Sequence, residues 1–590
     1  MKNQLTPLED MTENLFVGRE EELEDFWEWG TNIPAKFPHN SFALVGRRRT
    51  GKTTILTKLF NRLFDEQEEV LPVFITFSPF LNRKKTMTSY ELAKHYFSGY
   101  VRSYLAFRYR EPLFFRQNSK FEELYKFAQQ VDDEFILGLY KRYQINLKSD
   151  IPFDLVDWVI NFPRGEAAIH EMPTAMIVDE FQVLTNVYDP TQNVYHDYTD
   201  SFQQAAETRH APMLVSGSAV SLLVSQALTG MLHGRIVAHH LEPLSREETH
   251  DLVFRIGDDA GIEATDELAE MIWRLTDGYP YSVHALMRSR CGARKQLPSL
   301  DALQTISNFE VRHQNAILAQ HYGPEIEKYS ERLNDGPTTR RVMLWVTKYP
   351  NQFIDAEMAS EELGIDEKVA REALEKLRWI DIIEKTGIIS YTGPKDPMLR
   401  RYIEYQHYTE IEKLGPEKSL KDWEEEYKSL LGTLSNIKGE LGEMYVRMIM
   451  TRFAGQVVQG SHFNHDNTVQ LPHFDTIERR GGTVERGIKI ELDIIGEYKR
   501  ADEDTRGAWI VEVKYTQERI GADLIRHFIN NSKTFQAKTN YAAVTHWYFS
   551  KSGFTKDAIK LLASENILYN DWKQFRLLAR QLGYLGLPLN

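Results

Sequence analysis

The chain has 590 residues, of which 42% are hydrophobic and 26% are charged, so it is not mainly disordered, collagen-like or a coiled-coil rod. Asp and Glu number 85 against 71 Lys and Arg, and the net charge of −14 excludes a protein that binds nucleic acid over its whole surface. A single cysteine, Cys291, excludes an intrachain disulfide and a cysteine-ligated metal centre. Because the chain has no apolar leader and no long apolar run, we expect a multidomain cytoplasmic protein with no membrane partner.

A strand–helix–strand pattern opens the chain. Residues 41–45 are apolar and end at Gly46, residues 52–64 repeat apolar positions at helical spacing, and residues 70–77 favour a strand. This order predicts a parallel sheet. Two further apolar runs, at 175–178 and 213–215, predict more buried strands in the same sheet. The segment between, residues 81–170, is dense in Tyr and Phe and is predicted to be a helical insertion that packs on itself, with substrate binding by its aromatic residues as the alternative.

The remaining patterns are helical up to the last third of the chain. Residues 245–335 predict a helical lid, and residues 336–404 follow the helix–turn–helix–ribbon order of a winged helix. Its second helix, at 367–378, carries nearly balanced charges, so packing and major-groove reading both stay open. Residues 405–434 predict a helical linker, and residues 435–590 alternate helix and strand.

The strongest motif follows the first strand. Residues 46–53 match G-x-x-x-x-G-K-[ST], with a strand before and a helix after. The glycines let backbone N–H groups surround a phosphate, and the helix N-terminus adds positive charge. Lys52 is predicted to reach the β- and γ-phosphates of ATP, and the Thr53 hydroxyl to ligate Mg²⁺. The residues expected to hold the nucleotide here are Gly46, Arg47, Arg48, Arg49, Thr50, Gly51, Lys52, Thr53 and Thr54.

Acidic and polar groups end the next strands. Asp179, after residues 175–178, is predicted to hold Mg²⁺ through water, and Glu180 to act as the general base that polarises the attacking water. Ser216 or Ser218 would sense the γ-phosphate or orient water, unless they form only a polar turn. Arg235 would neutralise charge in phosphoryl transfer, within its own chain or across a subunit interface, or would be structural.

These motifs occur in a familiar order. Phe16-Val17-Gly18-Arg19-Glu20, the arginine-rich P-loop, Asp179-Glu180-Phe181, Ser216-Gly217-Ser218 and Gly234-Arg235 together resemble the archaeal-type ATPases, relatives of the AAA+ and STAND P-loop NTPases. The resemblance covers about residues 10–290. It implies that Val17, Gly18 and Arg19 lie near the nucleotide base, and that the protein is a homo-oligomer or a partner-regulated assembly. The interval between Lys52 and Asp179 is longer than this resemblance leads us to expect.

A second chemical site is predicted near the C-terminus. Residues 490–496 and 508–514 have the pattern of a β-hairpin, in which Glu512 and Lys514 face one side and Asp493 meets them across the hairpin. Two carboxylates and a lysine can hold one or two divalent cations, Mg²⁺ or Mn²⁺, and activate water against a phosphodiester. The alternative is a structural salt bridge between Lys514 and one of the acids.

This set resembles the PD-(D/E)XK nucleases, which have the restriction-endonuclease-like fold. Glu443, on a helix predicted at 438–450, stands where that fold places a helical metal acid. Archaeal-type ATPases often end in such a domain, active or decayed. The implied fold class is α/β: a P-loop NTPase parallel sheet with helical insertion and lid, a winged helix, and a C-terminal α/β restriction-endonuclease-like domain. The corresponding domains are 1–244, 245–335, 336–404, 405–434 and 435–590, with the insertion at 81–170.

Two functions follow from these motifs. The first is an ATP-dependent or ATP-regulated, metal-dependent nuclease that acts on DNA, with RNA not excluded, in antiviral defence or DNA repair. The second is a STAND-like ATPase switch or scaffold whose nuclease-like domain only binds. A DNA translocase is a third idea, for which the sequence offers no separate helicase motif series.

Overall fold

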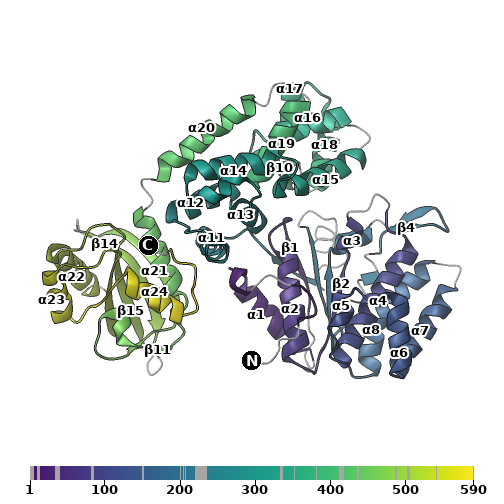
Figure 1. Ribbon diagram of the computed structural model, residues 1–590, viewed down its shortest axis with the longest axis horizontal. Helices are drawn as coiled ribbons and strands as arrows, with labels where there is room; N and C mark the ends of the chain where they lie inside the picture. The colour runs from purple at the N-terminus through teal and green to yellow at the C-terminus, as the bar shows by residue number, and fades with distance from the viewer. Residues whose placement is uncertain are drawn as a thin grey trace. The chain divides into compact units, whose positions relative to one another are not determined.

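The computed structural model describes residues 6–9, 13–33, 40–81, 86–148, 152–185, 187–198, 201–202, 205, 208–218, 236–332, 336–350, 352–379, 382–387, 389–410, 417–434, 438–485, 488–500, 505–537, 539 and 541–588. The chain forms two compact units (Figure 1). The first comprises Met1–Leu244, Thr276–Ala285 and Phe309–Pro416, and the second comprises Ser245–Leu275, Leu286–Asn308 and Glu417–Asn590. The segment 245–335, expected to be one lid, is therefore divided between the units. Among the described helices none is long and apolar enough to cross a membrane.

The first unit is built on a five-stranded parallel sheet in the order β2–β3–β6–β1–β7. Its strands are β1 (Ser41–Gly46), β2 (Leu71–Thr76), β3 (Thr174–Asp179), β6 (Met213–Ser218) and β7 (Ile236–His240). The first three strands are almost wholly buried, as parallel strands with helices on both faces must be. The carboxyl ends of all five strands lie at one edge, so the loops that follow them meet there.

Helices cover both faces of this sheet (Figure 1). On one face, α1 (Glu20–Thr31) and α2 (Lys52–Glu66) share a core with Leu44 and Ile177. On the other face lie α4 (Ser89–Arg108), α6 (Phe121–Gln130), α7 (Glu134–Leu147) and α8 (Pro152–Ile169), with the short α3 (Ser78–Leu81) and α5 (Leu113–Arg116) beside them. A Cβ at Gly99 of α4 would come within 2.8 Å of Ile75 in β2. The aromatic segment thus packs on the sheet rather than only on itself, because the strands need an apolar cover there.

The rest of the first unit includes residues 336–404, which are predicted to form a winged helix and are named the winged-helix part. A three-stranded antiparallel sheet, in the order β8–β10–β9, accompanies α17 (Ala356–Leu363) and α18 (Glu367–Trp379). The strands are β8 (Phe353–Asp355), β9 (Glu384–Lys385) and β10 (Ser390–Thr392), and the adjoining helices are α15 (Ile317–Arg332), α16 (Gly336–Val346) and α19 (Pro397–Glu410). On α18 two of the four cations pair with acids of the same helix, Arg371 with Glu367 and Arg378 with Glu375. This pairing favours packing over major-groove reading.

The second unit holds a mixed five-stranded sheet in the order β13–β14–β15–β16–β17. The first three strands pair antiparallel and the last two pairings are parallel. The strands are β13 (Thr476–Glu485), β14 (Ile488–Lys499), β15 (Arg506–Lys514), β16 (Ala543–Ser550) and β17 (Leu568–Asp571). One face packs on α22 (Ala522–Gln536) and α23 (Lys556–Ser564). The other packs on α21 (Lys438–Met450) and α24 (Trp572–Gln581), and a Cβ at Gly442 of α21 would meet Tyr515 at 2.4 Å.

Three helices of the predicted lid segment belong to this second unit: α11 (Arg246–Ala260), most of α12 (Asp266–Thr276) and the first part of α14 (Leu300–Arg312). The carboxylate of Asp266 accepts hydrogen bonds from the hydroxyls of Tyr445 and Tyr515, the latter at 2.7 Å. The linker helix α20 (Glu417–Leu434) joins the same unit through Tyr427, whose hydroxyl donates to the Leu300 carbonyl at 2.6 Å. These buried hydrogen bonds tie distant parts of the sequence together.

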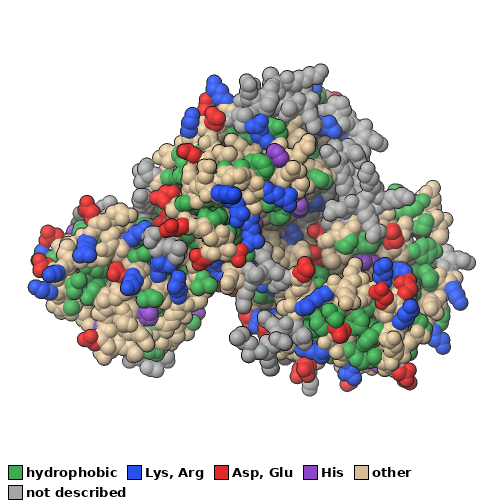
Figure 2. Space-filling model, in the orientation of Figure 1, with side chains coloured by type: hydrophobic (Ala, Val, Ile, Leu, Met, Phe, Trp, Pro, Cys, Tyr) green, Lys and Arg blue, Asp and Glu red, His purple; other side chains and the backbone are tan. Residues whose placement is uncertain are grey.

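Surface charge follows the composition. Figure 2 shows Lys and Arg interspersed with Asp and Glu over the visible face of the described residues. Anion binding must therefore depend on local clusters of cations, as the net charge of −14 predicts.

Candidate functional site

The P-loop connects β1 to α2 at the carboxyl edge of the parallel sheet. Gly51 has φ +98 and caps α2, and among the described residues no heavy atom beyond its chain neighbours lies within 4 Å of where its Cβ would be. No side chain fits at position 46, because a Cβ on Gly46 would lie 2.6 Å from the Leu241 carbonyl oxygen. The two glycines therefore permit a turn that other residues would strain or block.

Lys52 lies back across this loop and is 8% exposed. Its Nζ donates to the carbonyl oxygens of Gly46 and Arg47, both at 2.7 Å. Thr50 also donates to the Arg47 carbonyl, at 2.9 Å. The acceptors of Lys52 in these bonds are uncharged, so a phosphate oxygen would be a stronger partner for the ammonium than they are.

Asp179, at the end of β3, receives the hydroxyls of three neighbouring elements. Thr53 Oγ1 donates to its Oδ2 at 3.1 Å, Thr76 Oγ1 donates to the same oxygen at 3.3 Å, and Ser216 Oγ donates to Oδ1. The two residues predicted to hold Mg²⁺, Thr53 and Asp179, are thus adjacent. A carboxylate and a hydroxyl at a carboxyl edge fit this ion, which prefers oxygen ligands and keeps several waters.

Glu180 follows directly but leaves the strand. Its φ is +59, a left-handed conformation that is strained for a residue with a side chain, and its N–H donates to Ser216 Oγ at 3.4 Å. Such strain often accompanies functional positions. The predicted nucleotide contact of Ser218 concerns a side chain outside the described residues, and Arg235 also lies outside them.

The P-loop arginines contact the winged-helix part of the same unit. Arg47 Nε lies 2.7 Å from Glu384 Oε1, and Arg49 lies 4.0 Å from Asp396 and over the ring of Tyr322, 4.3 Å from its centre. Burial alone would raise the pKa of Glu384, but Arg47 and Lys395 hold it at about 2. Two of the three P-loop arginines are therefore engaged by protein acids.

The remaining predicted nucleotide residues frame the same region. Burial lowers the pKa of His321 to about 4, and the charges of Arg49 and Arg48 contribute to this. Thr54 lies on the first turn of α2 next to Thr53. Val17 is buried, Gly18 has φ +67, and the Arg19 side chain donates to the Glu242 carbonyl and pairs with Glu22 at 3.6 Å. Arg19 thus links the start of α1 to the chain after β7.

The second site lies where β14 and β15 pair. Ile494 stands opposite Val511, which brings Asp493 beside Glu512. Lys514 Nζ lies 2.6 Å from Glu512 Oε1 and 3.5 Å from Asp493 Oδ2. Asp493 also accepts the backbone N–H of Val513 at 2.8 Å. The structure brings together the three residues that the hairpin pattern predicted to meet.

Charge is concentrated at this point. Burial, with the charges of Asp493 and Glu443, raises the pKa of Glu512 to about 7, and Lys514 opposes this rise. Burial alone would lower the pKa of Lys514, but Glu512 and Asp493 outweigh it and raise that pKa. Glu443, on α21, is thus close enough to act electrostatically on Glu512. Perturbed groups gathered at one spot are typical of functional sites.

The carboxylates fit a cation with few protein ligands. Within the described part of the chain, no three His, Cys, Asp or Glu side chains converge closely enough to hold a metal ion. Asp493 and Glu512 alone would suit Mg²⁺, which is commonly bound through one or two carboxylates and several waters. The role of Glu443 as a metal ligand stays a prediction.

Sequence reasoning missed the residues that support both sites from a distance. Glu384 and Asp396 reach the P-loop from the winged-helix part, and no local pattern signals that contact. Lys551 follows β16 directly, and its N–H donates to the Lys514 carbonyl at 2.9 Å. The signal for Lys551 was available, because parallel neighbours of β15 must end at the same edge.

Comparison with known proteins finds only distant structural neighbours. No protein-family model and no curated protein sequence matches the chain. A Walker-type ATPase of Pyrococcus abyssi is 15% identical, with 68% of this chain and 99% of that chain covered and a TM-score of 0.43. The ORC2 protein of Aeropyrum pernix (ADPNP-ADP complexes) is 11% identical, with 68% and 95% covered and a TM-score of 0.38. The Holliday junction branch migration motor RuvB of Thermotoga maritima is 11% identical, with 69% and 99% covered and a TM-score of 0.30.

Likenesses this loose carry no inference about activity. The first unit has an α/β fold with a parallel sheet, and its P-loop, between β1 and α2, stands at the carboxyl edge of that sheet. Those features define the class, a P-loop α/β domain. The functions of the two sites rest on their own geometry.

Proposed function

We propose that the chain is an ATPase that also cleaves phosphodiester bonds in DNA with a divalent metal at its second site. The single observation that carries the nuclease part is the position of Lys514, within 2.6 Å of Glu512 and 3.5 Å of Asp493. Antiviral defence or DNA repair, a homo-oligomeric or partner-regulated assembly and a cytoplasmic location belong to the same proposal and rest on the sequence resemblance.

In the first unit, each residue has a defined task in this proposal. Lys52 would exchange its carbonyl partners for phosphate oxygens, and Thr53 with Asp179 would hold Mg²⁺. When bound, that ion supplies compensation for charge on the phosphates. Ser216 keeps the Asp179 carboxylate oriented, as its hydrogen bond to Oδ1 indicates. Glu180 would accept the proton of the attacking water.

In the second unit, Asp493 and Glu512 would hold Mg²⁺ or Mn²⁺. When bound, such an ion lowers the pKa of a coordinated water and so supplies a nucleophile. Glu512 has to lose its proton before it can bind the cation, and its pKa of about 7 places that step near neutral pH. Lys514 would then turn from the carboxylates towards the phosphate and stabilise the negative charge that develops on it.

A structural salt bridge accounts less well for this cluster. One carboxylate would neutralise Lys514, and the second leaves surplus negative charge at a half-buried position, where ions are costly to desolvate. Burial raises the pKa of Glu512 most, and the negative charges of Asp493 and Glu443 raise it further. A divalent cation would remove the surplus, and this supports a metal site.

A second candidate is a nucleotide-responsive switch whose C-terminal site only binds. The contacts of Arg47 with Glu384 and of Arg49 with Asp396 favour it, because ATP phosphates would compete for those guanidinium groups. In this case nucleotide would change the docking of the winged-helix part without any cleavage.

The test is a cleavage assay of the full chain on single-stranded DNA, duplex DNA and single-stranded RNA, with Mg²⁺ or Mn²⁺, with and without ATP. We expect metal-dependent cleavage of DNA that falls at least about 100-fold in Glu512→Gln and in Lys514→Met, while ATP hydrolysis is unchanged. Lys533→Met is the matched control, because this lysine is 64% exposed and pairs with Glu565 on the surface.

Two results would reject the assignment. If no nucleic acid is cut under any condition, the nuclease fails and the switch remains. If Glu512→Gln cleaves as fast as the wild type, cleavage belongs to another site or to a contaminant.

A further inference from the structure

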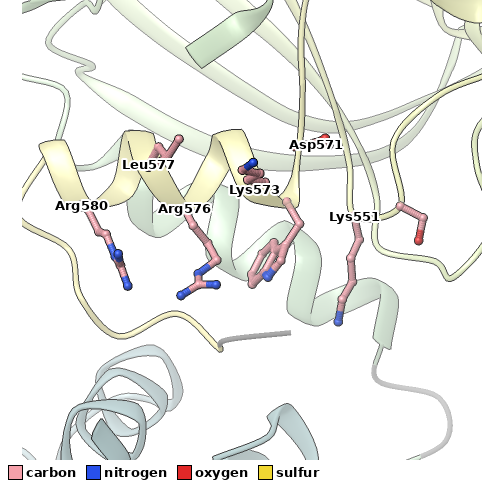
Figure 3. Close-up of a pocket in the computed structure, with 8 residues that line it drawn as sticks. Lys551, Asp571, Lys573, Arg576, Leu577 and Arg580 are labelled. Carbon is pink, nitrogen blue, oxygen red and sulfur yellow. The ribbon is translucent and has the colours of Figure 1, made fainter. Parts of the chain in front are cut away.

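The second unit contains a cavity of about 450 Å³ whose lining is strongly basic (Figure 3). Four of its eight lining residues are cationic: Lys551, Lys573, Arg576 and Arg580. The acid of the lining, Asp571, is engaged at the start of α24, where it accepts the N–H of Gln574 at 3.0 Å. In a chain of net charge −14, a cavity lined by four cations has the opposite charge to the chain as a whole, which suggests that it binds an anion.

The cationic side chains of this basic cavity lie near one another. Figure 3 shows Lys551, Arg576 and Arg580 extending to the same side of α24. Burial lowers the pKa of Arg576, the neighbouring charge of Arg580 lowers it further, and Asp258 opposes both. Lys551 lies 3.1 Å from the Tyr515 hydroxyl and 3.9 Å from Asp266. A bound anion would relieve the repulsion that remains between the two arginines.

The cavity also offers a hydrogen-bond donor. Trp572 lines it and is 8% exposed, and within the described residues its indole N–H has no hydrogen-bond partner. A buried indole N–H usually finds an acceptor. An oxygen-rich ligand would supply one.

The basic cavity begins beside the second site. Ser550, the last residue of β16, pairs with Lys514, and the N–H of Lys551 donates to the Lys514 carbonyl at 2.9 Å. Neighbouring strands lie about 4.8 Å apart, so the backbones of Lys514 and Lys551 are adjacent at the carboxyl edge of the sheet. Their side chains leave opposite faces of the sheet there, since Lys514 pairs with Ser550 and side chains alternate along a strand, while Lys551 lies over the rings of Tyr515 and Trp572. A DNA strand that crosses this edge would contact both places.

We propose that the basic cavity binds backbone phosphates of the DNA strand next to the phosphate presented to Lys514. This inference rests on the proposed nuclease function and adds the surface that holds its substrate. The same chemistry would suit a free phosphate or nucleotide, and the experiment separates these sources.

The test measures binding without cleavage. Fluorescently labelled single-stranded and duplex DNA are titrated with the full chain in EDTA, and anisotropy is recorded between 50 and 200 mM salt, a range over which phosphate contacts weaken steeply. The variant Lys573→Glu/Arg580→Glu changes two exposed side chains. We expect its affinity to fall at least about tenfold and its salt slope to fall by about two, because each lost phosphate contact removes about one.

Matched controls exclude general charge effects. Lys126→Glu/Lys141→Glu, at exposed positions of α6 and α7 in the first unit, alters net charge equally, and it should bind nearly as the wild type does. Lys573→Arg/Arg580→Lys keeps the cations and should keep the affinity. Thermal melting of each variant checks the fold.

Three results would overturn the proposal: DNA affinity and salt slope unchanged in Lys573→Glu/Arg580→Glu, an equal loss in both charge-reversed variants, or calorimetric binding of inorganic phosphate that this variant loses while DNA affinity stays the same. Failure of the nuclease is a separate outcome. If the wild type cuts no nucleic acid but Lys573→Glu/Arg580→Glu loses DNA binding, the basic cavity stands as a DNA-binding site and the proposed cleavage is rejected.

Discussion

The two proposed phosphate sites each place a lysine at the carboxyl edge of a sheet, but the partners of the two lysines differ. Lys52 donates to backbone carbonyls, and the nearby Asp179 is satisfied by hydroxyl groups. Lys514 lies directly against Glu512 and Asp493. In the first arrangement, the carbonyl oxygens that accept from Lys52 are neutral groups that a phosphate can replace. The second uses its lysine as a counter-ion, so cation binding there has to displace an existing ion pair.

The largest effect is expected from a substitution that weakens ATP binding at the first site and leaves the second site intact. Lys52→Ala should weaken ATP binding about 100-fold, because the charged hydrogen bonds to the phosphates are worth about 3 kcal/mol. Titration with a fluorescent ATP analogue measures it. Lys94→Ala is the control, since this lysine is 51% exposed on α4 and pairs with Glu122 on the surface. Unchanged ATP affinity in Lys52→Ala would reject the P-loop as the nucleotide site.

A smaller effect should distinguish the second site by its pH dependence. Glu512 is mostly protonated and neutral below pH 7 and mostly charged above pH 7. Because the charged carboxylate binds the cation, Mn²⁺ affinity should rise about tenfold between pH 6 and pH 8. The folded, metal-free protein holds this proton to higher pH than the unfolded chain does, so its free energy of unfolding should fall as pH rises from about 4.5 to 7. Mn²⁺ binding followed by electron paramagnetic resonance tests the first statement, and denaturant titration tests the second.

The control for both measurements is Glu512→Gln, which cannot titrate. It should bind Mn²⁺ weakly at every pH and should lack this part of the pH dependence of stability. A wild type whose Mn²⁺ affinity is flat from pH 6 to pH 8 would contradict the environment assigned to Glu512.

The smallest effect concerns the link between the P-loop and the winged-helix part. A double-mutant cycle with Arg47→Met and Glu384→Gln should give a coupling of about 1 kcal/mol, because the pair is mostly buried, with side chains 10% and 24% exposed. Denaturant unfolding of the four proteins measures it. Additive effects would show that this contact is absent in solution, and Arg47 would return to the list of nucleotide ligands.

Local patterns were sufficient to predict much of the fold. The run ending at Gly46 and the helix from Lys52 are contiguous features, and α17 and α18 follow directly from helical spacing and the glycine turn at Gly364, whose φ is +61. The Asp493–Glu512–Lys514 contact was predictable because two paired strands fix which residues meet. In each case the information lies within a few tens of residues.

Other features could not be predicted in this way. Within the predicted helical insertion, α6 ends at Gln130 and α7 begins at Glu134, because Asp132 adopts φ +52 and Asp133 caps α7 by accepting the N–H of Ile136 at 2.9 Å. The paired aspartates were a usable signal for that break. The contacts of Arg47 with Glu384 and of Asp266 with Tyr515 join residues hundreds of positions apart, and neither hydrophobic period nor motif spacing specifies them.

The position of Asp266 bears on how this architecture can be rearranged. Its carboxylate accepts hydrogen bonds from the buried hydroxyls of Tyr445 and Tyr515 in the C-terminal part, although Asp266 lies on a helix that follows closely after the P-loop sheet in sequence. A fragment that starts near residue 435 would keep Tyr445 and Tyr515 but lose their acceptor, at about 1–3 kcal/mol for each unsatisfied hydroxyl. The C-terminal part is therefore not an interchangeable cassette. A gene fusion or truncation that keeps these hydrogen bonds has to include the helix that begins at Asp266.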